Sequence, residues 1–82
     1  MNKEIHEHVN SIFYDYFGVR LNSKAYEKIA EWIERYGSEE VITSVYIACE
    51  RYDDFLEAFT RIGGVLFNRE KTRKMYFTDS EE

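Results

Sequence analysis

Histidine and cysteine are the first side chains to examine for metal binding or nucleophilic chemistry. The chain has two histidines, His6 and His8, and one cysteine, Cys49. Two positions apart on a helix, the histidines point about 200° apart, so they cannot bind one metal ion together. A single cysteine permits neither a disulfide within the chain nor a multi-cysteine zinc site. We therefore expect no metal and no cofactor, with His8 paired to Glu4 and Cys49 buried on an apolar helix face.

Acid/base chemistry and phosphate cradling are the next possibilities. Adjacent carboxylates occur at Glu39-Glu40, Asp53-Asp54 and Glu81-Glu82. The first two pairs lie where helices are expected to begin, so helix capping accounts for them. The glycine pair Gly63-Gly64 lacks the lysine and the glycine spacing of a phosphate-binding loop. No catalytic residue is predicted, and the chain is not expected to be an enzyme.

Charge is unevenly distributed along the 82 residues, whose formal sum is −5. Residues 1–60 carry 12 acids and 6 bases, residues 61–74 carry 1 acid and 5 bases, and residues 75–82 carry 3 acids. Cations in the middle segment could hold phosphates while its aromatics stack on bases. A plainer interpretation is a final helix whose basic side balances an acidic body. The predicted DNA or partner contacts are Arg61, Phe67, Asn68, Arg69, Lys71, Arg73, Lys74 and Tyr76.

An acidic face is the alternative contact surface. Glu27, Glu31 and Glu34 recur on one side of a predicted helix, where they could imitate DNA phosphates for a basic partner protein. Lysines and arginines are interleaved with them, and Glu31 precedes Arg35 by four residues, which favours an ordinary solvated, salt-bridged face.

The elements that position these residues are all predicted to be helical. The chain has no proline, and its four glycines fall at expected helix breaks. We predict a helix capped by Asn2 and ended by Gly18, one from Asn22 or Ser23 to Gly37, one capped by Ser38, and one capped by Asp53. Gly63-Gly64 either ends or kinks the last of these. The segment 41–47 is also β-prone, but no partner strand lies nearby.

The predicted fold is therefore all-α, a compact bundle of four to five short helices. One domain spans residues 1–77 and an acidic, frayed tail spans 78–82. Surplus Tyr and Phe side chains could form a homodimer interface. No signal peptide or membrane span is apparent in the sequence. We therefore expect a cytoplasmic location and no membrane partner. The predicted core comprises Ile12, Phe13, Ile29, Trp32, Ile33, Val41, Val45, Phe55, Phe59 and Ile62.

Residues 13–48 carry a recognisable pattern. It consists of Phe13-Tyr14-Asp15-Tyr16-Phe17-Gly18, Leu21-Asn22-Ser23, Trp32-Ile33-Glu34-Arg35-Tyr36-Gly37, and Val41-Ile42 with Val45 to Ala48. This pattern resembles the helical C-terminal domain of DnaD-like primosomal proteins and phage replisome organisers. The ending from Ile62-Gly63-Gly64 to Asn68-Arg69 resembles that of small uncharacterised phage and prophage proteins.

The resemblance implies a DNA-replication role. In the family, a tryptophan-containing motif and the basic segment after it help to bind DNA, but Phe59 stands where the tryptophan is expected. DNA contact is therefore carried over only to the basic residues after Phe67. The family's N-terminal winged-helix domain is absent from the sequence. We expect a phage or mobile-element accessory protein that contacts DNA or a replication protein. The alternative is a small acidic phage inhibitor of a host nucleic-acid enzyme, either a nuclease or a CRISPR effector.

Overall fold

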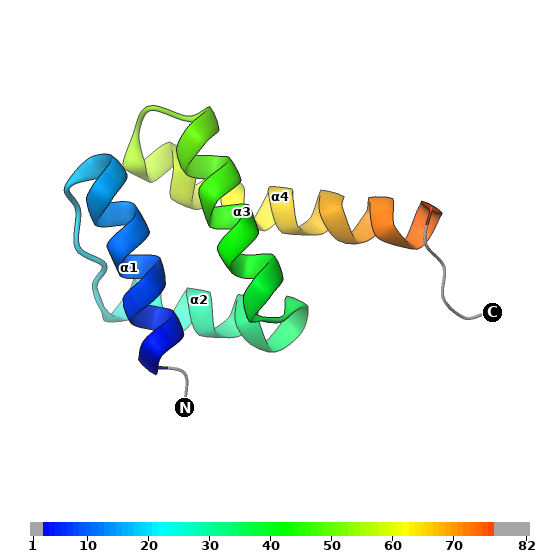
Figure 1. Ribbon diagram of the computed structural model, residues 1–82, viewed down its shortest axis with the longest axis horizontal. Helices are drawn as coiled ribbons and strands as arrows, with labels where there is room; N and C mark the ends of the chain where they lie inside the picture. The colour runs from blue at the N-terminus through cyan, green and yellow to red at the C-terminus, as the bar shows by residue number, and fades with distance from the viewer. Residues whose placement is uncertain (1–2, 77–82) are drawn as a thin grey trace.

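A computed structural model describes residues 3–76, which form an all-α, compact helical bundle, as predicted (Figure 1). Four helices follow one another along this part of the chain: α1 (Lys3–Phe17), α2 (Ser23–Tyr36), α3 (Ser38–Arg51) and α4 (Phe55–Tyr76). The predicted cap Asn2, the residue Phe77 and the predicted tail 78–82 lie outside the described residues. None of the helices within residues 3–76 combines the length and the apolar character that a membrane span needs.

The ends of α1 and α2 follow the local chemistry predicted for them. Gly18 has a positive φ of 68° and donates its backbone N–H to the Tyr14 carbonyl at 2.8 Å, which closes α1 with a left-handed residue. Asn22 caps α2, since its Oδ1 accepts a 2.9 Å hydrogen bond from the backbone N–H of Ala25. Gly18 and Asn22 thus mark the two ends of the loop that joins α1 to α2.

Gly37 is the only residue between α2 and α3, and its position differs from the predicted start of α3. Its φ of 95° requires a residue without a Cβ, and its N–H donates to the Ile33 carbonyl at 2.8 Å. Gly37 is also the N-cap of α3, without a side-chain bond, so the prediction of Ser38 as the cap was wrong. Ser38 is the first residue of α3, because Gly37 alone forms the connection between α2 and α3. The β-prone segment 41–47 is helical, as predicted.

The start of α4 lies one residue later than predicted. Asp54, rather than Asp53, caps it, because Asp54 Oδ2 accepts a 3.1 Å hydrogen bond from the Glu57 N–H. The extended backbone of Tyr52 ends α3 and leaves Asp53 in the bend between the helices. Gly63 and Gly64 lie inside α4, which runs unbroken for 22 residues. The glycine pair therefore does not end the helix.

An aromatic cluster fills the core where α1, α2 and α4 meet. Phe13 contacts Phe55 and Phe59 at ring-centroid distances of 5.3 and 5.9 Å, and Phe59 contacts Trp32 at 5.5 Å. Most of the predicted core residues are buried. The exceptions are Ile33, Phe55 and Phe59, which are half-buried and pack against the buried cluster from its rim.

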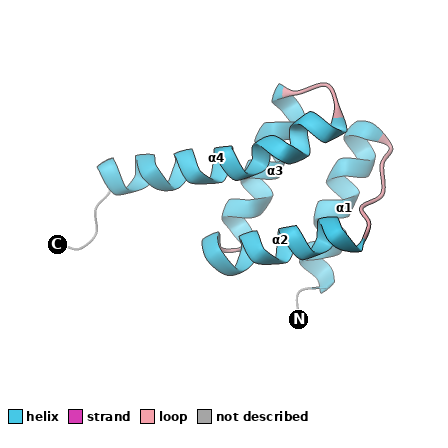
Figure 2. Ribbon diagram, turned by 180° about the vertical axis from the view of Figure 1, so that it is seen from behind, coloured by secondary structure: helices cyan, strands magenta, loops and turns pink. Residues whose placement is uncertain are grey.

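Helix α4 is longer than the bundle that it joins. Its first half packs in the bundle, where it passes behind α3 in the view of Figure 1, and its second half projects beyond the other three helices (Figures 1 and 2). The Cα radius of gyration is 13.2 Å, above the about 12 Å typical of a globule of this length. We call residues 65–76 the projecting half of α4.

Candidate nucleic-acid interface

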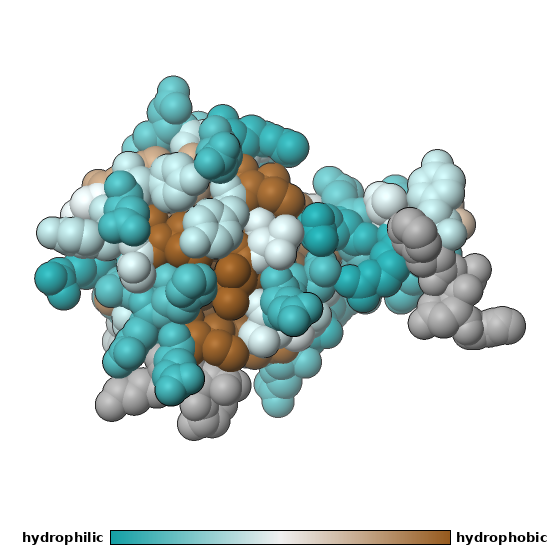
Figure 3. All heavy atoms as spheres, viewed as in Figure 1, coloured by the Kyte–Doolittle hydropathy of each residue, from teal (hydrophilic) through white to brown (hydrophobic). Residues whose placement is uncertain are grey.

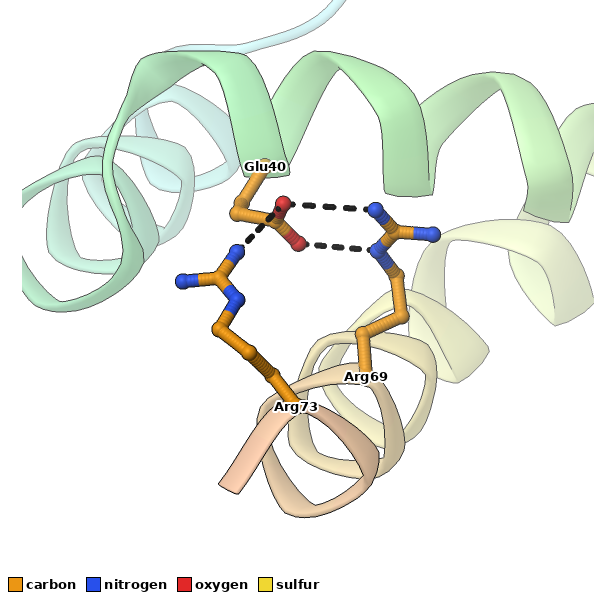
Figure 4. A network of polar contacts seen from close by, with 3 residues as sticks. All are labelled: Glu40, Arg69 and Arg73. Atoms are coloured by element: carbon orange, nitrogen blue, oxygen red, sulfur yellow. Dashed lines mark hydrogen bonds and ion pairs between the residues drawn. The ribbon is translucent and has the colours of Figure 1, made fainter. Parts of the chain in front are cut away.

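Two arginines of the projecting half converge on one carboxylate of α3 (Figure 4). Arg69 donates from Nε to Glu40 Oε1 at 2.8 Å and from Nη2 to Oε2 at 3.2 Å. Arg73 donates from Nη2 to the same Oε2 at 2.8 Å. Three of the ten N–H groups of the two guanidiniums are used in these bonds, so most remain able to donate. We call these three residues the arginine cluster.

Helix geometry places the cluster. Glu40 lies in the first turn of α3, and Arg69 and Arg73 are four residues apart, hence on the same face of α4. Only about a fifth of the Glu40 side chain is exposed, against 39% for Arg69 and 57% for Arg73. The hydrogen bonds from Arg69 lower the pKa of Glu40, and the same bonds raise the pKa of Arg69. Both groups are therefore charged at neutral pH, and the cluster keeps one net positive charge.

A hollow of about 340 Å³ opens beside the cluster. Asn68 and Thr72 line it together with Glu40, Arg69 and Arg73. An amide, a hydroxyl and the unused guanidinium N–H groups are the donors that a phosphate oxygen accepts from. The hollow is therefore suited to an anion.

Comparison with known proteins finds no protein-family model, no curated protein and no solved structure that matches this chain.

The structure divides the predicted contact residues between two faces of α4. Tyr76 lies seven residues after Arg69 and shares the face of the arginine cluster, and 71% of its side chain is exposed. Phe67 lies nine residues before Tyr76, half a helical rotation away, and shares its face with Lys71. The two exposed aromatics, which the sequence placed in one contact surface, are therefore not brought together.

Carboxylates from the same helix accompany two of the remaining cations. Arg61 lies 3.9 Å from Glu57 and over the Tyr52 ring at 5.7 Å, within the bundle half of α4. Lys74 Nζ lies 3.8 Å from Glu70. Lys71 has no ion pair with any residue of the described chain, 3–76. The basic segment is thus a set of locally balanced pairs with a small positive excess.

The alternative acidic face lies on α2. Glu27, Glu31 and Glu34 are all exposed. Glu31 pairs with Lys28 at 3.5 Å rather than with Arg35, whose guanidinium lies over the Tyr36 ring. This is the arrangement of a solvated helix surface, and the inhibitor hypothesis stays a prediction.

The histidines and the cysteine take part in packing. His6 stacks on Tyr26 with centroids 5.4 Å apart, and His8 meets the Tyr46 ring edge-on at 6.4 Å, so the predicted pairing of His8 with Glu4 was wrong. Burial raises the pKa of the Cys49 thiol to about 11, so the thiolate is scarce at neutral pH. Within residues 3–76, no three metal-binding side chains come together.

Sequence reasoning missed two residues of the site. The sequence pattern indicates Glu40 only as an acid at the start of a helix, and nothing in it distinguishes Thr72 from its basic neighbours. The four-residue spacing of Arg69 and Arg73 indicates a shared face, but only the tertiary packing of α3 on α4 shows which carboxylate that face meets.

Proposed function

We propose that this chain is a non-enzymatic adaptor that contacts DNA phosphates through the arginine cluster and its surroundings on the projecting half of α4. The replication context, in a phage or mobile element, comes from the resemblance of residues 13–48 to DnaD-like helical domains. Phe59, at the position of the family's tryptophan, packs against Trp32 and Phe13. The proposal therefore assigns DNA contact to residues after Phe67 alone.

The separation of charge in space is the observation that carries the proposal. The projecting half holds four cations and one acid, whereas residues 1–60 hold 12 acids and 6 bases. In Figure 3 hydrophobic surface gathers over the bundle, and the projecting end of α4 is hydrophilic. Phosphates that approach this surface meet four cations and only two neighbouring carboxylates, Glu40 and Glu70, so the local charge favours them although the body is acidic.

The dimensions of the projecting half also fit a duplex. Twelve helical residues span about 18 Å. The major groove of B-DNA, about 12 Å wide, admits an α-helix. Arg69, Thr72, Arg73 and Tyr76 would face one strand, with the free guanidinium N–H groups donating to phosphate oxygens.

Fluorescence anisotropy with labelled single- and double-stranded DNA tests the proposal. We expect wild-type binding to weaken steeply between roughly 50 and 200 mM salt. The double variant Arg73→Gln/Lys74→Gln leaves both hydrogen bonds from Arg69 to Glu40 in place and removes two cations. Its binding should be weaker, and its slope of log K against log salt should be smaller by roughly 1, the contribution of Arg73, because Lys74 lies about 140° around α4 from Arg69 and is not on the contact face.

The matched control is Lys24→Gln/Lys28→Gln, which removes the same charge from exposed positions on α2. This control should bind DNA as wild type does. Equal losses in the two double variants would show that only net charge matters, and equal binding by wild type and Arg73→Gln/Lys74→Gln would show that α4 is not the contact surface. Either result would overturn the proposal.

A further inference from the structure

Gly64 is a glycine that the bundle itself does not require. It lies inside α4, has no positive φ, is exposed, and an added Cβ would meet no atom within 4 Å. At Gly63, by contrast, an added Cβ would lie 3.7 Å from the Trp32 ring. An exposed glycine within a helix lowers helix stability relative to alanine. A helix surface bare of side chains at one point does, however, let a second backbone approach closely.

The residues around Gly64 form one outward stripe on α4. Positions three, four and seven residues away from Gly64 share its face, and all of them are exposed. We call this surface the Gly64 face; its other members are Glu57, Thr60, Arg61, Phe67, Asn68 and Lys71. Phe67 keeps 53% of its side chain exposed there. The buried residue Leu66 lies on the opposite side of the helix, so the Gly64 face points away from the buried core.

Charge on this face is complementary to itself. Glu57 lies seven residues before Gly64, and Lys71 lies seven residues after it. When two copies of α4 cross antiparallel about a two-fold axis at Gly64, each Glu57 meets Lys71 of the other copy. Lys71 has no ion pair with the described residues of its own chain, and the contact of Glu57 with Arg61 is 3.9 Å long. Both groups are therefore available to a second copy.

We infer that the Gly64 face of α4 is a self-association surface, on which two copies of this chain pair antiparallel with their Gly64 backbones in contact. Charge complementarity favours a second copy of this chain as the partner. In an antiparallel pair, the order Glu57, Gly64, Lys71 of one copy lies opposite the order Lys71, Gly64, Glu57 of the other, so opposite charges meet at both ends. The arginine cluster lies on another face of α4 and stays open in the dimer. A dimer of this kind leaves Arg69 and Arg73 free for DNA but covers Lys71 and Asn68, which belong to both surfaces.

Sedimentation analysis without DNA tests the inference. One helix pair buries little surface, so the dimer belongs to the weak class, and the protein should be measured from about 5 to 500 µM. Wild type should pass reversibly from monomer to dimer in this range. A protein that stays monomeric at the highest concentration, or whose largest species is a trimer or tetramer, overturns the inference.

Gly64→Gln is the steric variant, and Ala30→Gln, at an exposed position of α2, is its control. We expect Gly64→Gln to weaken dimerisation more than tenfold while the monomer melts at the same or a higher temperature, because glutamine is the better helix former. Ala30→Gln should dimerise as wild type does. Unchanged dimerisation in Gly64→Gln overturns the inference.

Charge exchange tests the register of the pairing. Glu57→Lys and Lys71→Glu should each weaken the dimer several-fold, since both place like charges opposite one another. The double variant Glu57→Lys/Lys71→Glu restores opposite charges and should recover the wild-type dissociation constant. Circular dichroism confirms that each variant keeps its helices. Additive losses in the double variant would show that the two residues do not meet, which contradicts the antiparallel arrangement.

Discussion

Arg69 holds Glu40 through two nearly parallel hydrogen bonds, of 2.8 and 3.2 Å, and so joins the projecting half of α4 to the start of α3. We expect Glu40→Gln to lower the free energy of unfolding by about 1 kcal/mol, the upper part of the range for partly exposed ion pairs. Urea unfolding at neutral pH measures this change. An unchanged midpoint would mean that the cluster does not support α4.

The same variant should have the opposite effect on DNA. Removing the carboxylate frees both guanidiniums and adds one unit of positive charge, so Glu40→Gln should bind DNA more tightly than wild type in the anisotropy assay. Loss of stability with gain of affinity separates the binding role of the arginines from their structural one. Weaker DNA binding by a folded Glu40→Gln variant would contradict this expectation.

Acid should remove the contribution of the arginine cluster to the stability of the fold. The pKa of Glu40 is lowered from its ordinary 4.5, so the ionised form is favoured in the folded state. Its contribution to stability is complete above pH 4.5 and is lost as the pH falls from there through the lowered pKa. The stability difference between wild type and Glu40→Gln should therefore shrink on acidification, which urea unfolding across that range measures.

Tyr16 should titrate late. Its hydroxyl donates to Glu50 Oε2 at 2.6 Å, and this bond raises the pKa of Tyr16 from 10.0 to about 12. The protonated phenol is favoured by the fold, so its contribution holds below pH 10 and is lost as the pH rises through about 12. Absorbance titration of phenolate should show one late tyrosine, absent from Tyr16→Phe and moved to ordinary pH in Glu50→Gln. Identical curves for wild type and Glu50→Gln would contradict the assignment.

Ser44 carries a hydroxyl that is buried and has no hydrogen-bond partner among the described residues. Because an unpaired buried polar group is destabilising and alanine is the better helix former, Ser44→Ala should raise the free energy of unfolding by about 1 kcal/mol. The exposed Ser11→Ala on α1 is the control and should change stability by less than about half that amount. A decrease in the Ser44→Ala variant would mean that the hydroxyl has a partner.

Gly63 and Gly64 should respond differently to a large side chain. The Trp32 ring lies 3.7 Å from the position of a Cβ on Gly63, so leucine there must displace the ring and should cost about 1 to 3 kcal/mol. At Gly64 an added Cβ meets no atom within 4 Å, so leucine there should leave the stability of the dilute monomer equal or higher. Thermal melts at low protein concentration compare Gly63→Leu with Gly64→Leu. Equal losses would show that the two glycines have equivalent surroundings.

The sequence predicts those parts of the fold that depend on near neighbours. Gly18, Asn22 and Gly37 act within a few residues, so the ends of α1 and α2 could be read from them. Asp53 and Asp54 are equally competent caps, and only the extended backbone at Tyr52 decides between them. A local sequence pattern therefore does not decide which of the two adjacent aspartates caps α4.

The candidate site could be predicted only as a segment. Residues 61–74 are visibly basic, but the faces on which they lie depend on whether α4 continues through Gly63-Gly64. The pairing of Arg69 with Glu40 spans 29 positions and arises from the packing of α3 on α4, for which no local pattern exists. The sequence alone therefore does not show which basic residues are neutralised by carboxylates far away along the chain.

The order in which the helices pack has a consequence for the kinetics of folding. Each helix packs mainly on the next helix along the chain or on the one after it, and the connections between them are short. Chains whose contacts are this local reach the native topology within microseconds to milliseconds. With no proline in its 82 residues, the chain is also free of the slow isomerisation that delays many small domains.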